Sequence, residues 1–200
     1  FQLRDRFSAL QGNAVPSVAL ERFLDEELGP SIEMVVSRSR SEWSKESGYD
    51  QPLPREHRTL SPSDFGFHNA LQTPDGTLIF LDFEFFGWDD PAKLVGDFVL
   101  HPGMHLSESE KKFWIHGATM LYGSGMLRRM EQIWPMLGLC WCLILLNDFR
   151  KDYSIRRRKA FGRLNKSDMA AQERQLVRSQ QLLIEIKSGH RGDLFSGYCD

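Results

Sequence analysis

The stretch from residue 60 to residue 91 constrains the fold of this 200-residue chain more than any other part. Within it, short apolar runs lie on either side of Pro-Asp-Gly at residues 74–76, a sequence typical of a turn between antiparallel strands. A β-hairpin brings the residues before its first strand close to those after its second strand. We therefore expect two polar clusters to meet at one end of the hairpin: Asp64 with Asn69, and Asp82 with Glu84.

The residue types in these clusters suit the transfer of a phosphoryl group from a nucleotide to a hydroxyl. In that reaction the protein must hold Mg²⁺ on the phosphates and place a base beside the acceptor, because the loose transition state needs little covalent help. Asp64 is the predicted base. Asn69 and Asp82 offer the hard oxygen ligands that Mg²⁺ prefers, and Glu84, expected on the same strand face as Asp82, is a further metal ligand candidate.

At these residues the chain resembles the aminoglycoside phosphotransferase and choline kinase-like family, small-molecule relatives of the protein kinases. The family pattern is His-x-Asp-x-x-x-x-Asn, then a strand ending Ile-Asp-Phe/Trp-Glu/Asp, then Gly-x-Gly/Asp-Asp-Pro. Three segments keep this order and spacing here: 64–69, 81–84 and 87–91. The resemblance implies that Asp64 is the catalytic base, that Asn69 and Asp82 bind magnesium, and that ATP is the phosphoryl donor.

Two positions depart from the family pattern. Pro62 stands where the family has a His two residues before the base, so a side chain that usually braces the loop is lost. The family often has an Asp three residues after the Asp-Pro proline, where this chain has Leu94. Asp97, one helical turn further along, is a candidate to replace it from the same face.

The nucleotide-gripping features of such kinases are not visible in this sequence. The family covers the phosphates with a glycine-rich loop and pairs them with a strand lysine, both in an N-terminal lobe. We find no Gly-x-Gly-x-x-Gly and no strand-like lysine before residue 60. The resemblance therefore implies a kinase-like C-terminal lobe, and we expect the nucleotide lobe upstream of Phe1. The expected parts of the C-terminal lobe, residues 1–200, are a catalytic loop at 61–69, a metal motif at 82–84 and a helical substrate-side subdomain at about 107–190.

Outside the central stretch the apolar residues recur at helical spacing, so the expected class is α+β and predominantly helical, with one small hairpin. Asp90 before Pro91 and the Ser-Glu-Ser-Glu at 107–110 are typical helix starts. Gly29-Pro30 is expected to end a helix, and Pro135 to kink a helix or to mark its start. The predicted helices cover residues 16–28, 31–48, 92–100, 107–122, 126–149 and 167–188.

Charge narrows the class of acceptor. Lys and Arg number 11 against 19 Asp and Glu through residue 125, and 14 against 8 afterwards, for a net charge of -2. The basic second half, including the predicted loop at 150–166, hints at an anionic ligand. A sugar, an amino alcohol or an anionic metabolite therefore suits the chain better than an aminoglycoside, and nucleic acid is not an expected partner.

Cysteine usage and the apolar runs point to a cytoplasmic protein. The cysteines are odd in number, and Cys140 and Cys142 lie in an apolar helix-like run with no His at ligand spacing; Cys199 is the third. This pattern favours buried thiols in a reducing compartment. No N-terminal signal is visible. The apolar run at 133–146, interrupted by Pro135, is shorter than the roughly 20 residues that span a bilayer, so no membrane partner is expected.

Plainer interpretations of the same residues stay open. Asp64 with Asn69 could form an Asx-type turn, Asp82 could be a polar strand end, and Glu84 could be solvated. His68 is expected to be a structural donor rather than a metal ligand, because no second His or Cys lies at ligand spacing. For the whole protein, the alternative to an enzyme is a non-catalytic kinase-like module that serves as a binding or regulatory surface.

Overall fold

The computed structural model describes four stretches of the chain: residues 3–44, 51–153, 166–188 and 192–195. These residues are mostly helical and include four short strands, so the predominantly helical α+β class is confirmed. The chain divides into two compact units. The first comprises Phe1–Lys45 and Gly138–Gly189, and the second comprises Glu46–Leu137 and His190–Asp200.

The first unit is built from helices. They are α1 (Leu3–Asn13), α2 (Val18–Phe23), the π-helical turn η1 (Leu24–Leu28), α3 (Gly29–Ser44), the end of α6 (Ser124–Leu145), the 3₁₀ turn η4 (Leu146–Phe149) and α8 (Lys166–Ser188). The core of this unit contains apolar side chains that recur at helical spacing. Those at most 1% exposed include Leu20, Phe23, Leu28, Ile32, Leu139, Leu146 and Leu183.

The predicted helix end at Gly29-Pro30 is wrong. The helix continues from α2 through η1 into α3, and Gly29 keeps a helical φ of -58°. Pro30 has no N–H to donate to the preceding turn, and the wider π turn absorbs this loss, because the N–H of Gly29 donates five residues back to the carbonyl of Leu24. Gly29 also permits close packing of α1, since a Cβ there would lie 3.0 Å from Phe7 Cζ.

Helix α6 runs without interruption through Pro135, so the alternative that a helix starts at this proline is wrong. The expectation that the apolar run is too short for a membrane is also overturned. The stretch Ser124–Phe149 is long and apolar enough by length and composition, but 67% of its apolar window is buried within the protein. Such burial is typical of a core helix that other helices surround.

Cys142 on α6 packs against Ser179 on α8. The Ser179 hydroxyl donates to the Cys142 carbonyl at 3.1 Å, the thiol donates to the Ser179 carbonyl at 3.6 Å, and both residues are 0% exposed. Burial raises the pKa of the Cys142 thiol to about 12, so it stays protonated and unreactive at neutral pH. The predicted buried thiol is thus confirmed for Cys142, whereas Cys140 is only half-buried and Cys199 lies outside the described residues.

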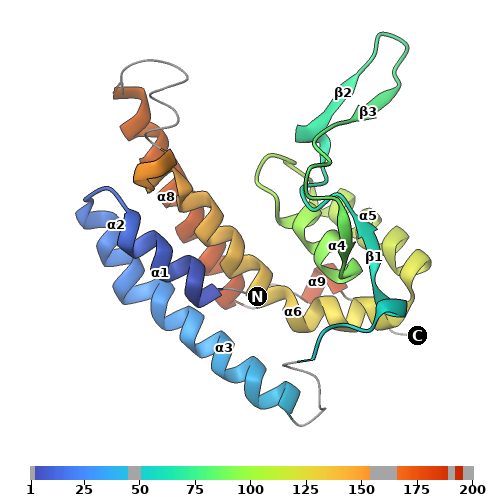
Figure 1. Ribbon diagram of the computed structural model, residues 1–200, viewed down its shortest axis with the longest axis horizontal. Helices are drawn as coiled ribbons and strands as arrows, with labels where there is room; N and C mark the ends of the chain where they lie inside the picture. Colours follow the sequence, from blue (N-terminus) through green and yellow to red (C-terminus); the bar gives the residue numbers. More distant parts are fainter. Residues whose placement is uncertain (1–2, 45–50, 154–165, 189–191, 196–200) are drawn as a thin grey trace. The chain divides into compact units, whose positions relative to one another are not determined.

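The second unit holds two antiparallel two-stranded sheets. One pairs β1 (Thr59–Ser61) with β4 (Gly87–Asp89), and the other pairs β2 (Ala70–Gln72) with β3 (Leu78–Phe80). The β2–β3 hairpin projects from the helices of its unit (Figure 1). Its turn confirms the prediction, with Gly76 at a φ of 88° and its N–H bonded to the Thr73 carbonyl at 2.9 Å. The β1–β4 pair was not predicted.

The helices of the second unit are α4 (Pro91–Leu100), α5 (Glu108–Tyr122), the start of α6 and α9 (Gly192–Phe195), with 3₁₀ turns η2 (Arg55–His57) and η3 (Phe67–Asn69). Helices α4 and α5 begin at the predicted capping signals, whereas α6 begins at Ser124 instead of residue 126 and α9 was not predicted. Asp90 Oδ1 accepts from the Ala92 N–H at 2.9 Å, and its other oxygen pairs with Arg129. Ser107 and Glu110 form a full capping box.

Candidate active site

An aromatic cluster supports the loop between β1 and β2. Phe65 of this loop stacks on Phe80 of β3, with ring centroids 4.8 Å apart, and lies 5.8 Å from Phe98 of α4. Phe98 stacks in turn on Trp114 of α5 at 4.0 Å and meets Phe67 edge-on at 5.8 Å. Aromatic pairs at such separations contribute about 0.5–1.5 kcal/mol each beyond the burial of their surface. The cluster therefore ties the loop to the hairpin and to two helices.

The backbone that leads into Asp64 is strained. Ser63 has a φ of 67°, in the left-handed region that residues other than glycine rarely adopt. The N–H of Asp64 donates to the Pro62 carbonyl at 2.9 Å, which closes a γ-turn around Ser63. The buried Ser61 hydroxyl accepts from the Ser63 N–H at 3.1 Å. Strain of this kind gathers where function fixes a side chain, and no local sequence signal indicated it.

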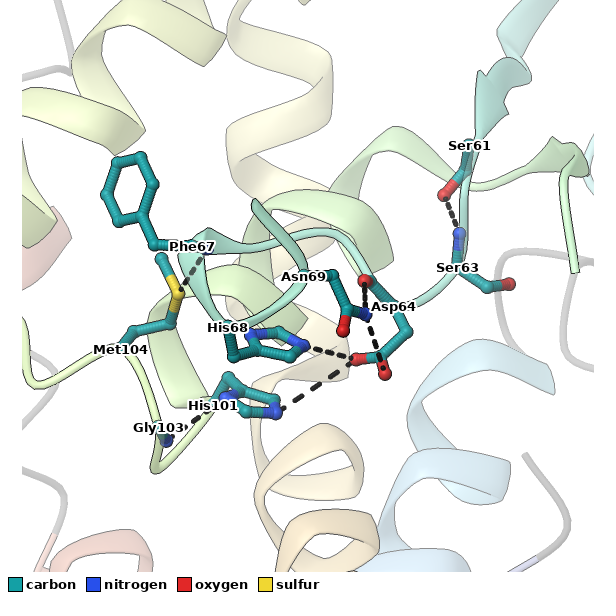
Figure 2. Close-up of polar contacts among 9 residues, drawn as sticks. All are labelled: Ser61, Ser63, Asp64, Phe67, His68, Asn69, His101, Gly103 and Met104. Atoms are coloured by element: carbon teal, nitrogen blue, oxygen red, sulfur yellow. Dashed lines mark hydrogen bonds and ion pairs between the residues drawn. The ribbon is translucent and has the colours of Figure 1, made fainter. Parts of the chain in front are cut away.

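Three side chains surround the carboxylate of Asp64, which is 51% exposed (Figure 2). His68 Nε2 lies 3.0 Å and His101 Nε2 4.0 Å from Asp64 Oδ1. Asn69 Nδ2 donates to the backbone carbonyl of Asp64 at 2.9 Å and lies 3.3 Å from Oδ2. The amide nitrogen of Asn69 thus faces Asp64, as its acceptor partners require, and its oxygen is turned to another side.

His68 and His101 form a stacked pair. Their rings are parallel within 4°, with centroids 3.8 Å apart. His101 follows the end of α4, 33 residues beyond His68, so the fold brings together two histidines that are not at ligand spacing in the sequence. Together with Asp64 they form the group of possible metal-ligating side chains found in the described part of the chain, with ligand atoms within 4.8 Å of one another.

The hairpin brings Asp82 to the end at which Asn69 lies, as predicted. The Leu81 N–H donates to the Asn69 carbonyl at 2.8 Å and extends the β2–β3 ladder by one pair, so Asp82 directly follows the residue bonded to Asn69. Asp82 has a φ of 63°, which turns the chain out of the strand. The expectation that Glu84 shares a strand face with Asp82 is wrong, because β3 ends at Phe80 and Glu84 lies in a turn.

One face of the hairpin is apolar and open to solvent. Antiparallel pairing sets Leu71 opposite Ile79 and, two pairs nearer the loop, Asn69 opposite Leu81. Side chains alternate along strands, so these four share one face, and the three apolar ones are 45–57% exposed. Phe80 points the opposite way and packs on Phe65. The face could therefore receive a flat, weakly polar ring beside Asn69.

Asp97 lies in an ion pair on its own helix. Its carboxylate is 2.9 Å from Lys93 Nζ, and Lys93 also reaches Asp89 at 3.2 Å. These two carboxylates raise the pKa of Lys93 against the opposing effect of its burial. The predicted bracing of the catalytic loop by Asp97 stays a prediction.

A separate pocket of about 430 Å³ in the second unit includes none of the predicted site residues. Several polar side chains that line the pocket already bind other groups of the protein. Arg58 donates to the Leu53 carbonyl at 2.7 Å, Arg129 pairs with Asp90, and the Tyr122 hydroxyl bonds to Thr59. We therefore assign this pocket no chemistry.

Gly66 gives the histidine pair its space. A Cβ at this position would lie 2.6 Å from Nδ1 of His68 and 2.7 Å from Sδ of Met104, which accepts from the Phe67 N–H at 3.2 Å. We expect Gly66→Ala to lower the free energy of unfolding by about 1–3 kcal/mol, as overpacking of a tight site does. Gly117→Ala on α5 is the matched control, because no atom lies within 4 Å of its Cβ. Urea unfolding should find the control unchanged or slightly stabilised; equal stability of both variants would contradict the packing.

The stability of the protein should depend on the protonation of His101. Burial, and then the neighbouring His68, lower the pKa of His101 from 6.5 to about 4, although Asp64 opposes the shift. Below pH 6.5 the unfolded chain therefore binds a proton that the folded chain refuses until about pH 4. As the pH is lowered from 6.5 to about 4, we expect the free energy of unfolding to fall. It should fall less in His101→Gln. Urea titrations with the same pH dependence in both proteins would refute this assignment.

No protein-family model, curated protein or solved structure matches the chain. The function must therefore be argued from the residues and from the geometry of the loop and hairpin.

Proposed function

We propose that this chain is the catalytic, metal-binding part of a kinase-like, ATP-dependent phosphotransferase that acts on a hydroxyl of a small molecule. The observation that carries the proposal is the arrangement at one end of the β2–β3 hairpin, where Asn69 contacts Asp64, and Asp82 follows the residue paired with Asn69. Asn69 bonds to Asp64 through its amide nitrogen, and the Asn69–Leu81 backbone bond sets Asp82 next in line. The proposed base and the two proposed oxygen ligands would thereby lie near the same end of the hairpin.

Asp64 is the proposed general base. Its Oδ1 accepts from the nearby His68, whereas within the described residues its Oδ2 has only the longer contact of 3.3 Å with Asn69. The acceptor hydroxyl would donate to Oδ2 and transfer its proton there as its oxygen bonds to the γ-phosphorus and the bond to the leaving ADP breaks. A positioned base of this kind contributes about 10²–10⁴-fold to the rate.

Asn69 and Asp82 are the proposed magnesium ligands. An amide oxygen and a carboxylate are the hard donors that Mg²⁺ takes, and the Asn69 amide is oriented with its nitrogen on Asp64 and its oxygen available. When bound, the ion would neutralise charge on the phosphates of ATP. Glu84 remains a candidate third ligand from the turn after β3.

The open apolar face of the hairpin offers a place for the nucleotide base. Leu71, Ile79 and Leu81 lie exposed on the same face as Asn69. A nucleotide base resting there would lie beside Asn69, one of the two proposed magnesium ligands. The sequence favours a sugar, an amino alcohol or an anionic metabolite as acceptor, and a cytoplasmic setting suits a protein that uses ATP.

The test is phosphoryl transfer by the natural full-length protein. We expect Mg²⁺-dependent transfer of labelled γ-phosphate from ATP to one class in a panel of sugars, amino alcohols, aminoglycosides and anionic metabolites. Turnover that disappears in Asp64→Asn supports the enzyme. Absence of nucleotide binding by calorimetry would instead support the non-catalytic binding module.

A further inference from the structure

We infer that His68 and His101 act as a stacked pair of positioning residues that fix the carboxylate of Asp64, holding Oδ1 so that Oδ2 faces the acceptor. This inference rests on the proposed function, in which Asp64 is the base. It assigns a task to two histidines that the sequence alone left to structural or surface roles. Figure 2 shows both rings with Nε2 on the side of Asp64.

The orientation of His101 is set by the backbone. The Gly103 N–H donates to His101 Nδ1 at 3.0 Å, so this nitrogen carries no proton. The proton of the neutral ring is therefore on Nε2, which faces Asp64 Oδ1. The ring is only 17% exposed, and a Cβ on Gly103 would lie 2.9 Å from its Cε1. The close fit holds the ring in this orientation.

His101 in turn supports His68. The rings lie face to face with centroids 3.8 Å apart, and the His68 side chain is 20% exposed. Because a carboxylate only accepts hydrogen bonds, the 3.0 Å contact requires the proton of His68 on Nε2 as well. The missing side chain of Gly66 leaves space for Cε1 and Nδ1 of the His68 ring. The pair thus presents two N–H groups to one oxygen, the nearer from His68.

The same geometry disfavours a metal ion between these residues. An imidazole nitrogen binds a metal in the plane of its ring at roughly 2 Å, and two parallel rings 3.8 Å apart cannot both do so for one ion. A metal on Nε2 of His101 would also shift the ring proton to Nδ1, where the Gly103 N–H already donates. We therefore interpret the group as a hydrogen-bonded Asp64–His68 pair with His101 stacked on His68.

Kinetics on matched variants of the full-length protein test this role. His68→Leu removes the nearer donor and should lower kcat by roughly tenfold to a hundredfold, the equivalent of one hydrogen bond to a charged group, with KM for Mg·ATP unchanged. His68→Gln restores an N–H and should recover most of the loss. His101→Phe keeps a stacking ring without nitrogens and should have a smaller effect. Combined with His68→Leu it should add little, because both act through one carboxylate.

The control is His116→Ala, an exposed histidine on α5, which should leave kcat unchanged. If His68→Leu raised KM with kcat unchanged, or if His68→Gln failed to recover kcat, the positioning role would be wrong. Circular dichroism of each variant separates these outcomes from misfolding.

A second measurement keeps this inference separate from the proposed function. Imidazole ¹⁵N NMR of the wild-type protein should find the proton on Nε2 of both rings, with slow exchange of the His68 proton that becomes fast in Asp64→Ala. Those signals without any phosphoryl transfer would contradict the function but keep the geometry. Protons on Nδ1, or Zn²⁺ that binds stoichiometrically and loses affinity in His101→Phe, would overturn the inference even in an active enzyme.

Discussion

Asp64→Asn is expected to lower kcat for phosphoryl transfer by about 10²–10⁴-fold, the contribution of a positioned general base. Asparagine has nearly the same size, and its side-chain oxygen can still accept from His68. Its backbone carbonyl still accepts from Asn69. The loop should therefore keep its form while the group that takes the proton is lost, and KM for Mg·ATP should stay close to the wild-type value.

Asp5→Asn is the matched control for this change, since Asp5 is exposed on α1 in the other unit. It should leave kcat and the unfolding midpoint unchanged. Steady-state assays on both variants, with nucleotide binding measured in parallel, separate loss of chemistry from loss of binding. Retention of more than about a tenth of wild-type kcat in Asp64→Asn would be too much activity for a variant without its base.

Asp82→Asn is expected to raise the Mg²⁺ concentration for half-maximal activity by on the order of a hundredfold, because one of two proposed ligands loses its charge. The choice of asparagine matters. Asp82 has a φ of 63°, and asparagine tolerates this left-handed conformation better than most residues. The expected loss therefore reports on the metal rather than on the backbone. High Mg²⁺ should restore part of the activity.

Glu84→Gln is the comparison for Asp82→Asn. Glu84 lies two residues further on and is exposed in the turn after β3, so it shares the solvent environment but not the backbone link to Asn69. We expect a much smaller change in the Mg²⁺ requirement. Equal shifts in Glu84→Gln and Asp82→Asn would mean that the carboxylates act only through the local negative charge.

Features that depend on a few adjacent residues could be predicted from the sequence. The Pro-Asp-Gly turn, the N-cap at Asp90 and the capping box at Ser107 each depend on bonds within about four residues, and all three form as expected. The pairing of Asn69 with Leu81, the residue before Asp82, followed from the turn, because the turn sets which residues of the two strands pair.

Features that depend on distant contacts could not be predicted. His101 reaches Asp64 only because α4 ends beside the loop, and the β1–β4 pair joins residues about 28 positions apart. The left-handed φ values of Ser63 and Asp82 have no sequence signal, since neither residue is a glycine. At Gly29, packing on Phe7 and the π turn outweigh the usual helix-ending tendency of Gly-Pro.

The division of roles between Asp64 and Asp82 is the central claim, and calorimetric titration of the natural full-length protein with ATP tests it without knowledge of the acceptor. The account predicts Mg²⁺-dependent nucleotide binding that Asp64→Asn leaves intact and Asp82→Asn weakens on the order of a hundredfold. Nucleotide binding that is absent, or that both variants weaken equally, would contradict the proposed separation of base and metal ligand.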